Sequence, residues 1–241
     1  MSLNTSSLSR RIGLLLPSAN TVFEPDFYRL IPDGWGVHTA RMYLPDTTVE
    51  GEERMLDEYV LPAARDVATS RPHVVVFGCT SAGALRGNEY EAQLIQQIAT
   101  TTGTTVVSVM KSVREALQAL QATRLVVIIP YVEPVDVRIR ASLEADGFEV
   151  LRIKGLGIQE SFQLGQVSAE AIIHLARQTV EDLKPDALFV SCTNFPAVRV
   201  LPDLRKLFPF PVIASNQVTI EKAIAVAKEK PNALSPMNEV S

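Results

Sequence analysis

The chain has 241 residues, of which 46% are hydrophobic and 21% charged, and its formal net charge at pH 7 is −4. This composition is typical of a soluble globular protein with enough chain for one large or two small domains. It lacks the basic footprint of a nucleic-acid-binding protein, and its apolar runs are too short to cross a membrane. Residues 1–9 have no apolar segment typical of a signal peptide, so we expect a cytoplasmic protein.

The first half of the chain alternates short apolar runs with amphipathic stretches. Apolar runs rich in β-branched residues and bounded by turns are typical of parallel strands buried on both faces. Alternation of strands with helices implies βαβ units with right-handed crossovers. In chain order we predict strands at 11–16, 37–42, 74–77 and 105–109, and helices at 52–70, 88–102 and 112–121.

The second half repeats this alternation. We predict strands at 125–129, 149–153, 187–191 and 211–214, and helices at 134–146, 168–183, 197–207 and 217–228. The predicted fold class is therefore α/β, with two pseudo-symmetric flavodoxin-like or Rossmann-like lobes that contain parallel sheets. We expect the functional site in the cleft between the lobes, where the strands end.

The predicted domain organisation follows from the order of these elements. The N-terminal α/β lobe comprises 10–115 and the C-terminal α/β lobe comprises 116–216. The last helix, 217–228, is expected to return to the first lobe. The polar ends, 1–9 and 231–241, are expected to be flexible tails.

An internal repeat relates the two halves. The same separation of 113 residues relates Cys79 to Cys192, Arg11 to Arg124, Pro17 to Pro130 and Pro72 to Pro185. Each cysteine ends an apolar run and is followed by a threonine. A repeat of this length indicates a duplicated domain, and it places the two thiols at equivalent strand ends.

Ligands of open parallel sheets bind outside the carboxyl ends of the strands. The residues that the sequence places there are rich in hydroxyl and amide groups and poor in carboxylates. Turn amides and helix N-termini at such positions favour anions, and we expect the same field to lower the pKa of a thiol. The candidate substrate-binding residues are Ser18, Asn20, Thr80, Ser81, Tyr131, Ser161, Thr193 and Asn194.

Cys79 and Cys192 are the candidate catalytic residues. A lone cysteine at a strand end is most often a small buried hydrophobe, and a disulfide between the two is a second alternative. Their matched positions and the threonine after each favour a catalytic pair instead. The two cysteines and three histidines have no zinc spacing, so we predict neither a metal ion nor a cofactor.

Two other features have simpler interpretations. The acidic run at 50–53 is interpreted as the solvated N-terminus of a helix, where negative charge is favoured. Tyr131 either packs between the lobes or donates its phenol to a substrate, and we favour the donor role.

Four segments resemble a known family. They are Pro-Ser-Ala-Asn-Thr at 17–21, Gly-Cys-Thr-Ser at 78–81, Pro-Tyr at 130–131 and Ser-Cys-Thr-Asn at 191–194. Together they resemble the Asp/Glu racemase superfamily, and within it the branch of maleate cis-trans isomerases and arylmalonate decarboxylases. The resemblance extends from residue 10 to about residue 228, which is the whole predicted core.

This resemblance implies a cofactor-independent isomerase of a small dicarboxylate, with Cys79 as the nucleophile and Cys192 as the acid/base. Decarboxylases of the branch lack the first cysteine, which argues against a lyase that acts on arylmalonates. A racemase of Asp/Glu type is an alternative, and so is an isomerase linked to ectoine degradation, whose family the segment 51–85 resembles. A non-enzymatic protein that binds small anions is a further alternative.

The resemblance also suggests the partners. We expect a small carboxylate substrate, no nucleic acid, no membrane, and a homo-oligomer, either a dimer or a tetramer. One residue departs from the pattern, because isomerases of this branch carry an asparagine where Ser161 aligns. A serine is shorter and lacks the paired donor and acceptor of an amide, so the identity of the diacid stays open.

Overall fold

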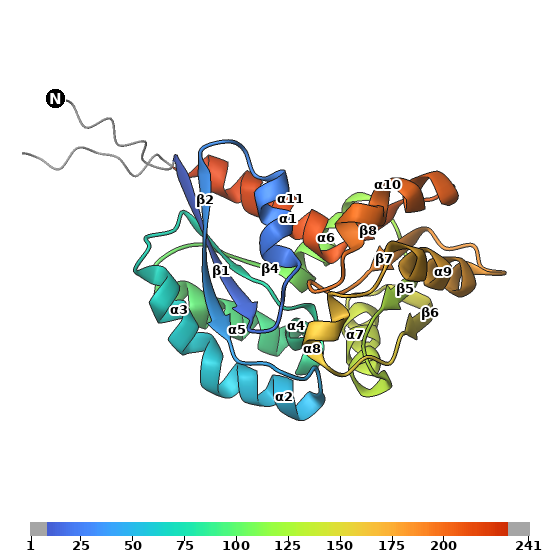
Figure 1. The fold of residues 1–241 in the computed structure, drawn as a ribbon, viewed down its shortest axis with the longest axis horizontal. Helices are drawn as coiled ribbons and strands as arrows, with labels where there is room; N and C mark the ends of the chain where they lie inside the picture. The colour runs from blue at the N-terminus through green and yellow to red at the C-terminus, as the bar shows by residue number, and fades with distance from the viewer. Residues whose placement is uncertain (1–8, 231–241) are drawn as a thin grey trace, which may run out of the picture.

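The computed structural model describes residues 9–230, which form two parallel sheets flanked by helices (Figure 1). The predicted tails, 1–9 and 231–241, lie outside the described residues except for Ser9. The first sheet has the spatial order β2 (Trp35–Met42), β1 (Arg10–Pro17), β3 (Val74–Phe77) and β4 (Val106–Ser108). The second sheet has the order β6 (Glu149–Gly155), β5 (Arg124–Ile129), β7 (Ala187–Val190) and β8 (Val212–Ala214).

The two sheets have the same topology and a matching register, except that an irregularity after Leu125 shifts the pairing of β5 with β6 by one residue. Ile12 on β1 lies between Val37 on β2 and Val74 on β3. Leu125 on β5 lies in the same way between Val150 and Ala187, and each of these residues follows its counterpart by 113 positions. The predicted α/β class with two pseudo-symmetric parallel lobes is therefore confirmed, and every predicted strand end is within two residues of its observed position.

Helices cover both faces of the sheets. Those of the first half are α1 (Phe23–Leu30), α2 (Val49–Arg54), α3 (Val60–Ala68), α4 (Thr80–Leu85), α5 (Asn88–Thr102) and α6 (Val109–Ala119), with a π-helical turn, η1 (Met55–Tyr59), between α2 and α3. Those of the second half are α7 (Glu133–Ala145), α8 (Ser161–Leu164), α9 (Ala169–Val180), α10 (Ala197–Leu207) and α11 (Ser215–Glu229). All seven predicted helices are present, and α2, η1 and α3 together form the one predicted at 52–70.

Three helices were not predicted: α1, α4 and α8. Every residue of α4 is buried, so its sequence has no apolar and polar alternation that could reveal a helix. Helix α8 has only four residues, too few to show a period. Helix α4 begins directly after Cys79 and α8 begins at Ser161, so two of these helices start at residues of the candidate site.

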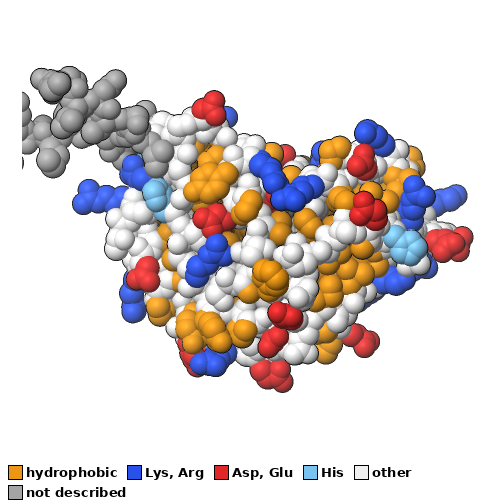
Figure 2. Space-filling model, in the orientation of Figure 1, with side chains coloured by type: hydrophobic (Ala, Val, Ile, Leu, Met, Phe, Trp, Pro, Cys, Tyr) orange, Lys and Arg blue, Asp and Glu red, His pale blue; other side chains and the backbone are white. Residues whose placement is uncertain are grey.

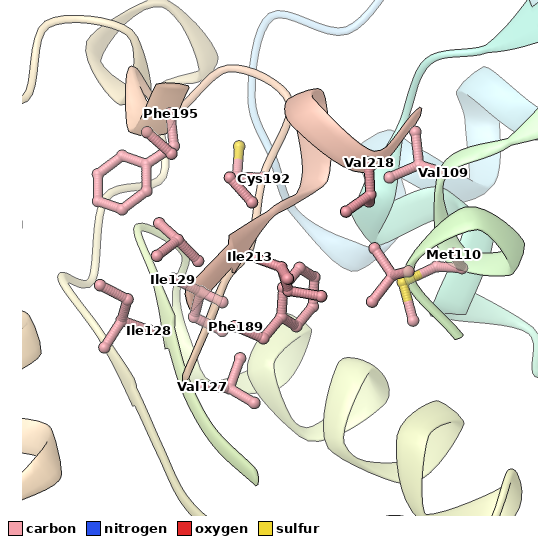
Figure 3. Packing of buried hydrophobic residues seen from close by; sticks show 14 of the residues in the cluster. Val109, Met110, Val127, Ile128, Ile129, Phe189, Cys192, Phe195, Ile213 and Val218 are labelled. Atoms are coloured by element: carbon pink, nitrogen blue, oxygen red, sulfur yellow. The ribbon is translucent and has the colours of Figure 1, made fainter. Parts of the chain in front are cut away.

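One hydrophobic core continues from lobe to lobe. Figure 3 shows Val109 and Met110 at the start of α6 on one side, and Phe189 on β7 and Ile213 on β8 on the other. Val218 on α11 lies between these two groups. Burial of apolar surface is the main favourable term in folding, so this shared core holds the lobes in one arrangement.

Helix α11 leaves the second sheet and packs against α6 and β3 of the first half. Near its far end, the guanidinium of Arg10 on β1 donates to the carbonyl oxygen of Ala227 over 2.9 Å. The predicted boundary between 115 and 116 falls inside α6. The division of the chain into those two domains stays a prediction.

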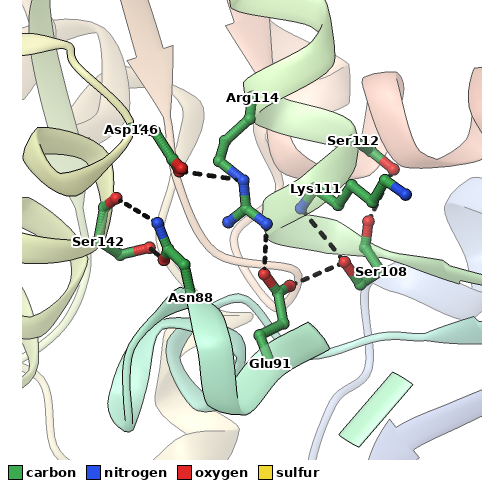
Figure 4. Close-up of polar contacts among 8 residues, drawn as sticks. All are labelled: Asn88, Glu91, Ser108, Lys111, Ser112, Arg114, Ser142 and Asp146. Carbon is green, nitrogen blue, oxygen red and sulfur yellow. Dashed lines mark hydrogen bonds and ion pairs between the residues drawn. The ribbon is translucent and has the colours of Figure 1, made fainter. Parts of the chain in front are cut away.

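A polar network also joins the halves (Figure 4). Arg114 on α6 pairs with Glu91 on α5 at 2.5 Å and with Asp146 at the end of α7 at 3.0 Å. Asn88 at the start of α5 exchanges hydrogen bonds with Ser142 on α7. Glu91 is 2% exposed, and a buried carboxylate of this kind is stabilised by its paired cation.

The surface carries both signs of charge. On the face shown in Figure 2, acidic and basic side chains are interspersed. Within residues 9–230, no helix combines the length and apolar character needed to span a bilayer. The same residues contain no group of three or more His, Cys, Asp or Glu side chains that could hold a metal ion.

Candidate active site

A small cavity lies between the carboxyl ends of the two sheets. Its volume is about 20 Å³, which is room for about one water molecule. The residues that line it are Pro17, Asn20, Leu44, Thr47, Cys79, Ser81, Tyr131, Ser161, Leu164, Cys192, Thr193 and Asn194. Eight of the ten residues predicted for the site are therefore brought together here.

Cys79 follows β3 and precedes the first residue of α4. Its sulfur lies 3.6 Å from the hydroxyl oxygen of Ser81, and the thiol is 4% exposed. There is no space for a side chain at the preceding Gly78, because an added Cβ would lie 2.9 Å from the carbonyl oxygen of Leu15. The close packing of β3 against β1 therefore fixes the position of the Cys79 thiol at the end of the strand.

Cys192 follows β7 in a different backbone conformation, with a φ of 107°. A residue with a side chain seldom adopts this region, and such strain is concentrated at functional sites. The sulfur accepts a hydrogen bond from the backbone amide of Asn194 over 3.2 Å. The backbone amide of Cys192 donates to the hydroxyl of Ser215 over 3.2 Å, which holds the turn against α11.

The thiols are not acidified, contrary to the expectation from the strand-end field. Burial raises the pKa of Cys79, and the negative charge of Glu52 raises it further. Burial also raises the pKa of Cys192 to about 12, although the Tyr131 phenol and the Asn194 amide act in the opposite direction. Loss of hydration therefore outweighs the local dipoles. Both thiols are free in the structure, so the disulfide alternative is excluded.

Asn20 and Thr193 connect the two halves across the cavity. The side-chain amide of Asn20 donates to the hydroxyl of Thr193 over 3.0 Å, and that hydroxyl donates to the carbonyl oxygen of Gly78 over 3.0 Å. The side-chain oxygen of Asn20 accepts from the backbone amides of Val22 and Phe23 at the start of α1. Asn20 is thereby held in one orientation and ties the Cys79 and Cys192 loops together.

Asn194 is a second connector. Its side-chain oxygen accepts from the backbone amide of Thr21 over 2.9 Å, and its amide donates to the backbone carbonyl of Ser161 over 2.6 Å. The hydroxyl of Ser161 is 2.8 Å from that of Thr47. These contacts place the loop before α8 over the cavity, where Figure 1 shows α8 between the two halves.

Two residues predicted for substrate binding, Ser18 and Thr80, are not among the residues that line the cavity. The hydroxyl of Ser18 accepts from the backbone amide of Leu44 over 3.0 Å. The hydroxyl of Thr80 donates to that of Ser215 over 3.2 Å. Each therefore holds a neighbouring loop in place, and the sequence pattern had assigned them to binding because they follow strand ends.

Sequence reasoning missed the apolar wall of the cavity, formed by Pro17, Leu44 and Leu164, and the hydroxyl of Thr47. The short segment around Leu44 was not placed in any element, and α8 was not predicted. These residues reach the cavity only because the loop that contains Leu44 and Thr47 meets the loop before α8. No local sequence pattern reveals that contact.

Glu52 overturns the interpretation of the acidic run at 50–53 as fully solvated. Its side chain is 0% exposed, and burial raises its pKa to about 8. One signal could have revealed it, because Glu52 stands three and four positions before Met55 and Leu56, which are also buried. That spacing places all three on one helical face.

The sequence as a whole matches the profile of the arylmalonate decarboxylase family over residues 12–237. The chain therefore belongs to the arylmalonate decarboxylase family. It is 27% identical over 219 residues to the maleate isomerase of Nocardia farcinica, a match that covers 86% of this chain and 85% of the relative.

Solved structures share the fold. A mutant of the Nocardia farcinica maleate cis-trans isomerase with a covalently bound succinylcysteine intermediate superimposes with a TM-score of 0.82 at 24% identity, over 91% of this chain and 93% of the other. A mutant of the maleate isomerase Iso from Pseudomonas putida S16, solved with maleate, gives a TM-score of 0.85 at 19% identity, over 91% and 92% of the two chains.

Proposed function

We propose that this protein is a cofactor-independent isomerase of a small dicarboxylate, similar to maleate cis-trans isomerases, with Cys79 and Cys192 as its catalytic residues. The observation that carries this proposal is that two free, buried thiols from equivalent strand ends line one small cavity. The similarity to the Nocardia farcinica maleate isomerase supports the same reaction class. An intermediate held on a cysteine in a related fold supports covalent chemistry.

In the proposed reaction the Cys79 thiolate attacks one alkene carbon of the cis diacid. A sulfur–carbon bond forms, and the π electrons move onto the adjacent carbon and its carboxylate. The Cys192 thiol protonates that carbon, which leaves a single carbon–carbon bond that can rotate. The Cys192 thiolate then removes the proton again, the sulfur–carbon bond breaks, and the trans diacid leaves with no net change in the protein.

The substrate carboxylates need hydrogen-bond donors inside the cavity. We propose Ser81, Tyr131 and the hydroxyl pair of Thr47 and Ser161, because these hydroxyls line the cavity. Asn20, Thr193 and Asn194 contribute by holding the two cysteine loops, since their side chains are already engaged with other loops. The hydroxyls of Thr47 and Ser161 hydrogen-bond to each other, which leaves one of the two O–H groups free to donate to a carboxylate.

A decarboxylase of malonates would need one thiol to protonate its product. The second thiol, Cys79, lines the cavity beside Ser81 and would have no function in that reaction. An isomerase or a two-base racemase uses both thiols, so either of these activities explains the presence of Cys79 in the cavity, which a decarboxylase does not.

The test is turnover of maleate by the purified protein, followed by the appearance of fumarate in proton NMR. Cys79→Ser and Cys192→Ser should each abolish it, and maleate should protect both thiols from alkylation. Parallel reactions in D₂O with aspartate and with phenylmalonate test racemisation and decarboxylation. Absence of conversion and of deuterium exchange with all three acids would disprove the proposed function.

The biological setting is part of the same proposal. We propose that the protein works in the cytoplasm as a homo-oligomer, either a dimer or a tetramer, that takes a small carboxylate as its substrate and binds neither nucleic acid nor a membrane. The small size of the cavity supports a small ligand. Light scattering of the purified protein tests the oligomeric state.

A further inference from the structure

Asn216 is a buried residue that no step of the proposed reaction uses. It is the second residue of α11, it is 1% exposed, and it is not among the residues that line the cavity. Its side-chain nitrogen donates to the carboxylate of Asp26 over 2.8 Å and to the backbone carbonyl of Thr193 over 3.1 Å. Because a carboxylate and a carbonyl oxygen both accept hydrogen bonds, these two contacts fix the orientation of the amide.

The side-chain oxygen of Asn216 shows that this orientation is maintained at a cost. The oxygen is buried and has no hydrogen-bond partner within residues 9–230. A buried acceptor without a partner destabilises the folded state, and such groups are rare in folded proteins. The fold therefore keeps both N–H groups of Asn216 engaged although the oxygen of the same amide stays unpaired.

The carbonyl that Asn216 binds belongs to the peptide unit that contacts the sulfur of Cys192. Thr193 supplies the carbonyl of this unit, and Asn194 supplies its N–H, which donates to the sulfur over 3.2 Å. A peptide unit is planar, and its carbonyl and N–H point in opposite directions when it is trans. A hydrogen bond that holds the carbonyl therefore also aims the N–H at the sulfur.

The first residue of α11 holds the other end of the same turn. The hydroxyl of Ser215 accepts from the backbone N–H of Cys192 over 3.2 Å. Cys192 lies between these two contacts with a φ of 107°, a conformation that is unfavourable for a residue with a side chain. Such strain persists only where the surrounding structure holds it, and the first two residues of α11 supply that support.

We propose that Asn216, oriented by Asp26, is a positioning residue that directs the backbone N–H of Asn194 at the sulfur of Cys192 and so stabilises its thiolate form. A charged acceptor forms a stronger hydrogen bond than a neutral one, and a hydrogen bond to the carbonyl of a peptide strengthens its N–H as a donor. The proposal rests on the proposed function only for the use that the reaction makes of this thiolate.

The contact from Asn194 acts on Cys192 in the expected direction. Its N–H lowers the pKa of the thiol, against the larger effect of burial. A substitution at Asn216 leaves the titratable and charged groups around both residues in place, so a change in Cys192 reactivity reports on the turn itself. These groups are Tyr131 after β5, Cys79 after β3 and Glu52 on α2, which face Cys192, and Asp26 and Arg29 on α1 and Arg199 on α10, on the side of Asn216.

The test is the rate at which iodoacetamide alkylates Cys192 between about pH 7 and about pH 9, measured on the Cys192 peptide by mass spectrometry. Only the thiolate reacts, and the pKa of Cys192 is raised to about 12, so the rate reports the thiolate fraction throughout this range. In Asn216→Leu, which keeps the branched shape of asparagine without its N–H groups, the rate should be about tenfold lower at each pH, because a hydrogen bond to a charged group is weakened. The Cys79 peptide of the same sample is the internal reference, and its rate should not change.

Two further variants separate this role from a loss of stability. Asn216→Leu leaves the carboxyl of Asp26 buried without its amide and should unfold at a lower urea concentration. The double variant Asp26→Leu/Asn216→Leu removes both partners, so it should recover part of that stability and still show the tenfold loss of Cys192 reactivity. Loss of the negative charge of Asp26 would by itself favour the thiolate, so it cannot cause a lower rate. Thr219→Val removes a buried hydroxyl that donates to the carbonyl of Ser215 over 2.7 Å, and it should leave the reactivity of Cys192 unchanged.

A Cys192 rate that is unchanged or higher in either leucine variant would overturn the proposal, and so would an equal loss in Thr219→Val. None of these measurements needs turnover. If the rate falls as expected but no diacid is isomerised, the positioning of the Cys192 turn stands and the proposed function fails. If maleate is converted and the rate is unchanged in Asn216→Leu, the proposed function stands and Asn216 does not position Cys192.

Discussion

The hydroxyls of Thr47 and Ser161 lie 2.8 Å apart, although the two residues are 114 positions apart in the sequence. Backbone contacts support this meeting, because the amide of Ser161 donates to the carbonyl of Pro45 and that of Thr47 donates to the carbonyl of Gln159. The two loops therefore close one side of the cavity as a unit. A diacid that enters meets a pair of hydroxyls whose spacing is already set.

Thr47→Val tests this pair, because valine keeps the shape of threonine and removes only its hydroxyl. We expect the KM for the diacid to rise about fivefold to tenfold with a smaller change in kcat, since one hydrogen bond contributes about 1 kcal/mol. Thr47→Ser keeps the hydroxyl and should preserve the KM. Steady-state kinetics measure both, and an unchanged KM in Thr47→Val would remove the hydroxyl pair from substrate binding.

Asn194→Ala should reduce stability as well as activity. Asn194 is 4% exposed, and its truncation leaves the amide of Thr21 and the carbonyl of Ser161 without their partner. Buried groups left unpaired in this way cost about 1–3 kcal/mol. Urea unfolding measures the loss, with Gln163→Ala as the control because Gln163 is an exposed residue on α8, the helix that begins at Ser161. If Asn194→Ala and Gln163→Ala unfold at the same urea concentration, Asn194 does not stabilise the contact between the loops.

The stability of the protein should depend on pH through Glu52. Its pKa is raised on folding from 4.5 to about 8, so between these values the native state holds a proton that the unfolded chain has lost. The free energy of unfolding then falls as pH rises through this window. Glu52→Gln removes the effect, so the variant should match the unmodified protein at about pH 4.5 and exceed it by a few kcal/mol at about pH 8.5.

Urea unfolding of both proteins at the two pH values measures this difference. Asp136, whose pKa is raised to about 7 by burial, is present in both proteins and its contribution cancels in the comparison. If the free energies of unfolding of the two proteins differ by the same amount at both pH values, folding does not raise the pKa of Glu52.

The sequence predicted the fold well because its signals are local. Continuous apolar runs such as Val74–Phe77 reflect strands covered on both faces. The separation of Cys79 from Cys192 reflects a duplication that the strand register preserves. Both features depend only on neighbouring residues or on a comparison of the two halves.

The chemistry of the site was less predictable, because it depends on burial. Glu52 and Glu53 are adjacent and chemically the same, yet one is 0% exposed and the other pairs with Arg86 at the surface. The polar surroundings of Cys79 suggested an acidic thiol, but desolvation has the larger effect on its pKa. Sequence patterns place these groups near one another without showing how much water remains.

The two cysteines differ in backbone conformation, and this difference predicts opposite effects of the same pair of substitutions. Cys79 has a φ of −134°, which any residue adopts, whereas Cys192 has a φ of 107°. At Cys79, alanine should be more stable than glycine by about 0.5–1 kcal/mol, because glycine loses more conformational entropy on folding. At Cys192 the order should reverse by about 1 kcal/mol, since glycine relieves the strain and alanine retains it.

All four variants lack a thiol and should be inactive, so the comparison isolates the backbone. Thermal unfolding of Cys79→Ala, Cys79→Gly, Cys192→Ala and Cys192→Gly gives the two differences directly. A reversal at Cys192 alone would show that the fold accepts a strained turn there in order to hold the second thiol toward the cavity, where the backbone amide of Asn194 donates to the sulfur. Alanine more stable than glycine at both positions would instead mean that the turn after β7 carries no strain.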